Sequence, residues 1–193
     1  MAITYQEETP QSTTSPLLGE ESTELAHGRA LRPEAQRVVS AFERALEQSF
    51  TVVDAASGDV YQSAADRLPC DLTSRLPVLE EVARRGRPEI VDEVAPVLML
   101  AIPLPAAALD PPTVAVTMVL TEPVREESQI ASAAQAFGAH PQQVLRWAQS
   151  RIPWHPQAVM QISLAINEKL ATQQHAAQLK KQVAEISSHL LNT

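Results

Sequence analysis

Residue types used by enzymes and metal sites occur in this sequence, but their spacing forms no known chemical motif. The five glycines form neither GxGxxG nor GxxxxGK, so no loop that cradles phosphate is predicted. No two histidines have the HxxxH spacing, the single cysteine cannot complete a structural zinc site, and the nucleophile motif GxSxG is absent. We therefore expect a chain that is not an enzyme, with no catalytic residues and no metal ligands.

Three features nevertheless invite a chemical interpretation. Cys70 in "LPCDL" has the reactivity needed to anchor a tetrapyrrole, but no histidine adjoins it, which favours a half-buried small apolar residue. His189 in "EISSHLLNT" lies in a helical pattern without the acidic residue and proline that follow a phosphoacceptor histidine, so it is interpreted as a surface histidine. In "RWAQSRIPWHP", Trp147, Trp154 and His155 suit either a small apolar pocket or, as the favoured interpretation, packing of the rings.

The composition narrows the class of protein. The chain has 193 residues, 45% of them hydrophobic, and a formal net charge of −8, so one domain with appendages is expected and nucleic acid or an anionic membrane is disfavoured as a partner. One cysteine cannot form an internal disulfide, and neither a signal peptide nor an apolar run long enough to span a membrane is visible. We expect a soluble, cytoplasmic protein.

The elements that must position any site follow from hydrophobic periodicity. Residues 1–32 are rich in Glu, Ser, Thr and Pro and predict a disordered tail. Helical spacing then begins at Pro33, recurs in "LTSRLPVLEEVARRG" and returns after Leu120 as three helices, of which the last starts at Pro156 and continues without a stop signal, which suggests a fragment. Five strands are predicted at residues 50–54, 59–62, 89–93, 97–104 and 114–120. The expected core comprises Phe42, Val52, Leu79, Val82, Leu100, Ile102, Val116 and Met118.

The order of these segments resembles a GAF domain over residues 32–170. The segment "RRGRPEIV" leads into a strand, with Gly86 and Pro88 at the family's positions, and "MLAIPL" resembles its apolar-Ile-Pro-Leu strand. The loop "AAALDPPT" lacks the usual glycine, and "AQAFGAHPQQVLRWAQSRIPWHPQAV" resembles PocR-type sensory domains instead. The signature of cyclic-nucleotide-binding members is absent, so the resemblance identifies no ligand or cofactor.

The resemblance implies an α+β fold with a central antiparallel sheet of about five strands flanked by helices. It implies a GAF-like (PAS-like) sensory domain at residues 33–157, a signalling helix at 158–193, and a role as the input domain of a multi-domain signalling protein. By analogy with such domains, a small ligand would lie between the sheet and the helices that hold "EEVARRG" and the hairpin of residues 50–62. The residues expected to border it are Tyr61, Cys70, Met99, Met118 and Trp147. A structural dimerisation module without ligand, and less so a small enzyme, remain as alternatives.

The last helix carries a heptad pattern that predicts a partner. Apolar residues alternate at spacings of three and four in its second half, as a coiled-coil seam requires. Lys169 and Thr172 interrupt the pattern, which indicates that the helix packs on its own domain up to about Ala171 and on another chain beyond it. We predict a parallel homodimer through Ala176, Leu179, Val183, Ile186 and Leu190.

Overall fold

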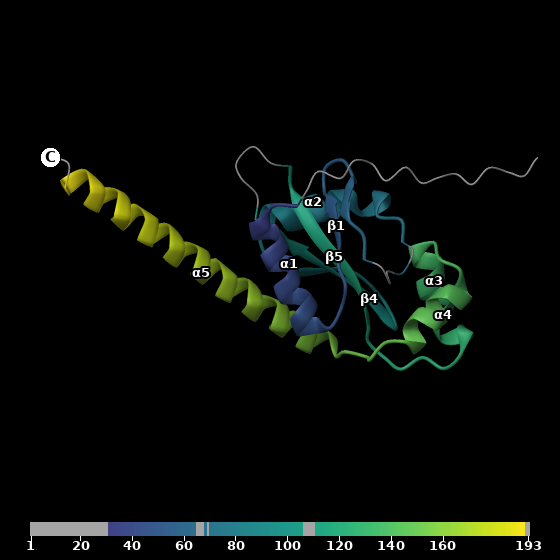
Figure 1. Ribbon diagram of the computed structural model, residues 1–193. Coiled ribbons are helices and arrows are strands. Elements are labelled where there is room, and N and C mark those ends of the chain that lie inside the picture. Colours follow the sequence, from purple (N-terminus) through teal and green to yellow (C-terminus); the bar gives the residue numbers. More distant parts are fainter. Residues whose placement is uncertain (1–30, 65–67, 69, 106–110, 192–193) are drawn as a thin grey trace, which may run out of the picture.

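The computed structural model describes residues 31–64, 68, 70–105 and 111–191 (Figure 1). It contains one antiparallel sheet of five strands in the order β2-β1-β5-β4-β3, with helices on both sides. The strands are β1 (Thr51–Asp54), β2 (Val60–Gln62), β3 (Glu89–Val94), β4 (Val97–Pro103) and β5 (Thr113–Leu120). The predicted α+β class and all five predicted strands are confirmed.

The helices precede, interrupt and follow these strands along the chain. They are α1 (Pro33–Leu46), η1 (Thr73–Arg75), α2 (Leu76–Arg85), η2 (Glu127–Ile130), α3 (Ala131–Phe137), α4 (Pro141–Gln149) and α5 (Pro156–Leu191). The first of the three helices predicted after Leu120 therefore begins as a 3-10 turn. There Gln129 accepts hydrogen bonds from the backbone N–H groups of Arg125 and Glu126, at 2.7 and 3.0 Å, and so closes a capping box.

Most of the predicted disordered tail, residues 1–30, lies outside the described residues. The two tail residues that are described contact the domain. Leu31 packs against the core, and the Arg32 guanidinium donates to the carbonyl of Pro105 at 2.8 Å. The chain is therefore attached to the domain just before α1 begins.

Helices cover both faces of the sheet, and the side chains along its two longest strands point alternately to one face and the other. On β4, Val97, Met99 and Ala101 face a core beneath α2, α3 and α4, which we call the α2-side core. Their neighbours Leu98, Leu100 and Ile102 face a second core beneath α1 and the first part of α5, the α1-side core. Strands covered on both sides read as continuous apolar runs, which explains "VLMLAIPL" and "TVAVTMVL". Every residue of the predicted core is buried.

Two tight turns use residues suited to them. In the hairpin between β1 and β2, the Asp54 carboxylate accepts hydrogen bonds from the N–H groups of Ala56 and Ser57, and Gly58 takes a φ of 82°. After α2, Gly86 takes a φ of 68° and its N–H donates to the carbonyl of Val82 at 3.1 Å.

The last helix, α5, packs on the domain only along its first part. Val159 and Ser163 are fully buried against the α1-side core, and Ile166 and Leu170 are partly buried there. From Ala171 to Glu185 every described side chain is exposed, and the helix leaves the domain as a single rod (Figure 1). Leu179 is 48% exposed and Val183 is 62% exposed. The side chains of Ile186 and Leu190 lie outside the described part of the structure.

Candidate functional site

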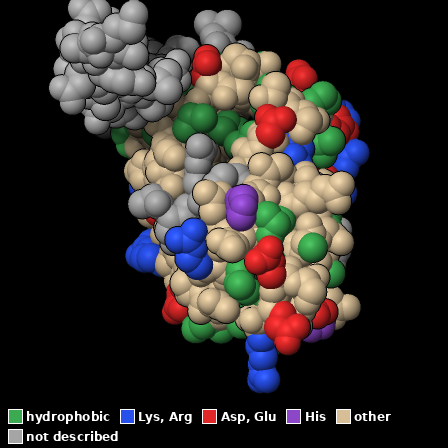
Figure 2. Space-filling view, turned by 90° about the vertical axis from the view of Figure 1, so that its right-hand side faces the viewer, with side chains coloured by type: hydrophobic (Ala, Val, Ile, Leu, Met, Phe, Trp, Pro, Cys, Tyr) green, Lys and Arg blue, Asp and Glu red, His purple; other side chains and the backbone are tan. Residues whose placement is uncertain are grey.

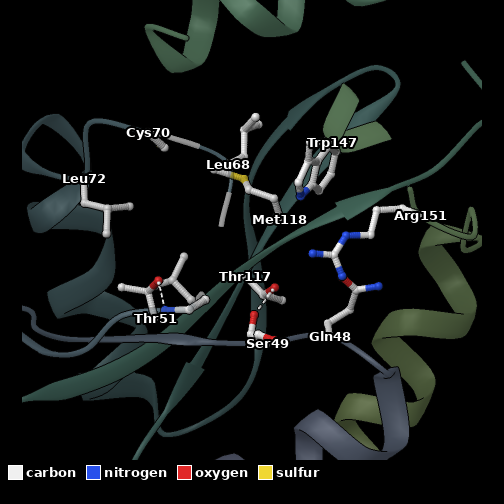
Figure 3. A pocket seen from close by; sticks show the side chains of 12 residues that line it. Gln48, Ser49, Thr51, Leu68, Cys70, Leu72, Thr117, Met118, Trp147 and Arg151 are labelled. Atoms are coloured by element: carbon white, nitrogen blue, oxygen red, sulfur yellow. Dashed lines mark hydrogen bonds between the residues drawn. The ribbon is translucent and has the colours of Figure 1, made fainter. Parts of the chain in front are cut away.

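A cavity lies on the α2-side face of the sheet, at the end where β1 and β5 meet α4 (Figure 3). Its walls come from four places: the link between α1 and β1, the strands β1 and β5, the segment after β2, and the C-terminal end of α4. The lining residues are Gln48, Ser49, Thr51, Ala64, Leu68, Cys70, Leu72, Val116, Thr117, Met118, Trp147 and Arg151.

The strand side of the cavity is polar, and its hydroxyl groups form hydrogen bonds with backbone groups of the cavity wall. The Thr117 hydroxyl donates to the carbonyl of Ser49 at 2.9 Å, and the Thr51 hydroxyl accepts from the N–H of Ala64 at 3.3 Å (Figure 3). Gln48, Thr51 and Thr117 are each buried, with exposed fractions of 5 to 7%. Buried hydroxyls and amides need such partners, and the cavity retains polar groups able to orient a bound molecule.

The helix side of the cavity combines an aromatic ring with a cation. The Arg151 guanidinium lies 5.9 Å from the centre of the Trp147 ring, and its Nη1 donates to the Gln48 side-chain oxygen at 3.4 Å. Trp147 lies in the last turn of α4, and Arg151 follows in the turn after the helix, where its N–H donates to the carbonyl of Ala148 at 3.1 Å. Both side chains therefore reach the same wall. Leu68 and Met118 approach the same space from the opposite side (Figure 3).

Three of the five residues predicted to border a ligand come together here. Cys70, Met118 and Trp147 line the cavity. Met99 is fully buried in the same α2-side core on β4, but it is not among the described lining residues. Tyr61 packs against the α1-side core, on the other face of the sheet. The cavity also lies at the α4 end of this face, and no residue of α2 lines it.

The polar lining was missed from the sequence. Gln48 and Ser49 occupy a short link between helix and strand, where polar residues are ordinary and give no signal. Arg151 did give a sequence signal, because it stands four residues after Trp147 in a segment whose pattern predicts a helix. The sequence motif that suggested a pocket instead joined Trp147 with Trp154. The structure separates these rings, since Trp154 packs against the α1-side core.

The size of the cavity limits what it holds in this conformation. About 30 Å³ is open to the centre of a water-sized sphere. A single water needs roughly 10–15 Å³ by this measure, whereas ligand pockets commonly reach about 300–1,000 Å³. The cavity therefore admits a very small molecule, and a larger ligand requires the side chains on its walls to move. Its groups suit binding by apolar contact and hydrogen bonds.

A separate group of charges surrounds the end of α2. Glu81 accepts hydrogen bonds from Nε of Arg84 at 2.6 Å and from Nε of Arg85 at 2.7 Å, and these bonds lower the pKa of Glu81 from 4.5 to about 2. Arg85 also pairs with Glu89 of β3 at 2.9 Å. These pairs are exposed and join α2 to the strand that follows it. Within the described residues, no three side chains of His, Cys, Asp or Glu are grouped as metal ligands.

The surface around α3 and α4 has a mixed character. Acidic, basic and apolar side chains of the described residues are interspersed on this face without a concentrated basic patch (Figure 2). Among the described residues, no helix combines the length and apolar character that a membrane span requires. Comparison with family models, curated proteins and solved structures found no match to the chain.

Proposed function

We propose that this chain is a cytoplasmic sensory or regulatory input domain of a multi-domain signalling protein. A small ligand or a partner acts at the domain, the state of the domain is relayed through α5, and a second copy of the chain pairs with α5. The cavity is the candidate ligand site. The GAF-like order of segments in the sequence supports this class of function.

The single observation that carries the proposal is the course of α5. The helix begins packed on the α1-side core and then extends into solvent with Leu179 and Val183 exposed. An isolated helix with such an apolar stripe is only marginally stable in water. A second chain covering the stripe removes that cost, and a paired helix can transmit a change to whatever follows it.

The cavity is connected to α5 by a short path. Arg151 of the cavity wall precedes Pro156, the first residue of α5, by five positions. Within this link the N–H of Trp154 donates to the carbonyl of Leu120 at 2.7 Å. Leu120 ends β5, the strand that also supplies Val116, Thr117 and Met118 to the cavity. A ligand that displaces β5 or Arg151 therefore acts on the segment that positions the start of α5.

The second candidate is a structural dimerisation module that binds no ligand. The observation that favours it is the small free volume of the cavity, which resembles an ordinary packing defect more than a ligand pocket. As a structural module, the chain still pairs with a second copy through α5, but its domain only spaces or orients the segments joined to it. The two candidates differ in what occupies the cavity.

Native mass spectrometry of the purified full chain, beside its Ala64→Leu variant, separates them. Ala64 is 7% exposed and lines the cavity, so leucine fills part of the free space. For an input domain we expect a small molecule that accompanies the wild-type chain and is lost from the variant. For a structural module we expect no such molecule and an unchanged or higher melting temperature in the variant, because an empty space has been filled.

Ala165→Leu provides the matched control. Ala165 is an exposed residue of α5 away from the cavity, so the same change in side chain there leaves any bound molecule in place. The sensory proposal fails if no molecule accompanies the wild-type chain and Ala64→Leu stabilises it. It also fails if both variants lose the bound molecule equally.

A further inference from the structure

The helix α1 lies beside α5 (Figure 1). A groove runs between α1 and the middle of α5, on the opposite face of the sheet from the cavity. Its floor is apolar and contains Ala41 and Ala45 of α1 and Ile166 and Leu170 of α5. Ile166 and Leu170 also contact the α1-side core. The groove therefore adjoins the place where α5 is still held against the domain, just before it leaves.

The rim of the groove is positively charged. Arg37 and Arg44 project from α1, and Lys169 stands opposite them on α5. Arg37 pairs with the exposed Glu34 at 3.2 Å, and Arg44 donates through Nε to the carbonyl of Ser40 in its own helix. No acidic side chain is among the described residues that line the groove. In a chain of net charge −8, a basic groove with an apolar floor suits an acidic segment with apolar anchors.

The chain itself contains such a segment. Residues 15–24 read "SPLLGEESTE", with adjacent Leu17 and Leu18 followed by Glu20, Glu21 and Glu24. The first 30 residues contain no lysine or aspartate, and Arg29 is their one arginine. Two leucines match the apolar floor, and three glutamates match the three rim cations.

The connection is long enough for this segment to reach the groove of its own chain. Leu31 and Arg32 are fixed on the domain at the start of α1, seven positions after Glu24. Seven residues span up to about 23 Å when extended, whereas the groove follows α1 from Gln36 to Ala45, about 14 Å at helical rise. A tether this short also holds the segment at an effective concentration of about a millimolar, so weak contacts suffice.

We propose that residues 15–24 occupy the α1–α5 groove of the same chain and clamp α5 to the domain. Leu17 and Leu18 cover the floor, and the glutamates pair with Arg37, Arg44 and Lys169. Because the groove is shared by α1 and α5, the bound segment resists any separation of α5 from the domain. The N-terminal segment is thus a regulatory element acting on α5. This proposal does not depend on a ligand in the cavity.

Photo-crosslinking of the full chain tests the proposal. Leu18 is replaced by the photoreactive residue p-benzoylphenylalanine, which keeps an apolar side chain, and the crosslinked peptides are mapped by mass spectrometry. We expect crosslinks concentrated in the α1 and α5 peptides that contain Ala41, Ala45, Ile166 and Leu170. An equal mixture of isotopically heavy and light chains shows whether each crosslink joins residues of one chain or of two.

Charge exchange provides the specific test. The double variant Arg44→Glu with Lys169→Glu removes two exposed ion pairs, and we expect the crosslink yield in the groove to fall at least about fivefold. Adding Glu20→Lys and Glu21→Lys restores the yield, because the opposite charges are then exchanged. The control Arg125→Glu with Arg146→Glu makes the same change in net charge at exposed residues outside the groove and leaves the yield unchanged.

Three results would overturn the proposal. Crosslinks spread over the surface without enrichment in the groove show that the segment does not dock there. Mixed heavy–light crosslinks at the frequency that random pairing of chains gives assign the groove to a second copy. An equal loss of yield in the control variant shows that net charge, and not these residues, controls the contact.

Discussion

The proposed pairing of α5 predicts a specific effect of shortening Leu179. Leu179 is a seam residue of the heptad pattern, and Leu179→Ala removes most of the side chain that a partner helix would cover. The change is made in the full chain, so that the domain and the rest of α5 remain as they are. We expect a weaker dimer with an unaltered domain.

The magnitude follows from the exposure of this residue in a single chain. Leu179 is 48% exposed, so the partner can cover only about half of it. Burying a whole leucine stabilises by about 2 kcal/mol, and half of that is about 1 kcal/mol per chain. Both chains of a homodimer carry the substitution, which gives about 2 kcal/mol per dimer. The dissociation constant should therefore rise roughly 30-fold.

Sedimentation equilibrium of the wild-type chain and the variant measures this change. Leu164→Ala is the matched control, because Leu164 lies on the same helix, is 44% exposed, and stands off the seam at the position two after Ile162. Its substitution should leave the dissociation constant unchanged. A chain ending at Ala171 lacks the seam and should sediment as a monomer.

Two outcomes refute the reasoning. If the wild-type chain is a monomer at micromolar concentration, the seam does not pair and the relay through α5 fails with it. If Leu164→Ala weakens the dimer as much as Leu179→Ala does, the chains associate through a different face of the helix.

Three further predictions concern the domain. Ile102→Ala should lower the free energy of unfolding by about 2–5 kcal/mol in urea denaturation, because Ile102 is fully buried on the interior strand β4. Val60→Ala, on the edge strand β2 and 44% exposed, should change it by no more than about 0.5 kcal/mol. Gly86→Ala should cost about 1–2 kcal/mol in the same assay, since alanine meets no atom within 4 Å there but must adopt a φ of 68°. The pKa of Glu81 is lowered to about 2, so its contribution to stability is complete above pH 4.5 and is lost as the pH falls towards 2; Glu81→Gln should flatten this part of the stability profile, and an unchanged profile would contradict the assignment.

The sequence was sufficient to predict the sheet because its strands differ in a visible way from its helices. Residues such as Leu98, Leu100 and Met118 belong to short continuous apolar runs, which are typical of strands covered on both faces. Gly58 and Gly86 marked turns that need a positive φ. By contrast, α1 ends at Leu46 because Glu47 takes a left-handed φ of 51°, and no glycine announces this ending.

The candidate site was less predictable because it depends on contacts between distant segments. Cys70, Met118 and Trp147 were selected by analogy with GAF and PAS domains, and these residues from three separate segments of the chain line the cavity. Gln48 and Arg151 are 103 positions apart, and their contact arises only when the end of α4 packs beside the link before β1. Tyr61 was predicted to border the ligand, but it packs against the α1-side core on the other face of the sheet. Alternation along the short strand β2 does not show which face of the sheet each side chain meets.

The length of α5 has a mechanical consequence. The part of α5 from Ala171 to Leu191 measures about 30 Å at helical rise, and it contains no glycine or proline at which to bend. Such a rod acts as a lever whose pivot is the last contact with the domain, near Leu170. A tilt too small to disturb packing at the pivot becomes a displacement many times larger at the tip. The domain can therefore keep a close-packed core and still produce a large movement at the far end of its last helix.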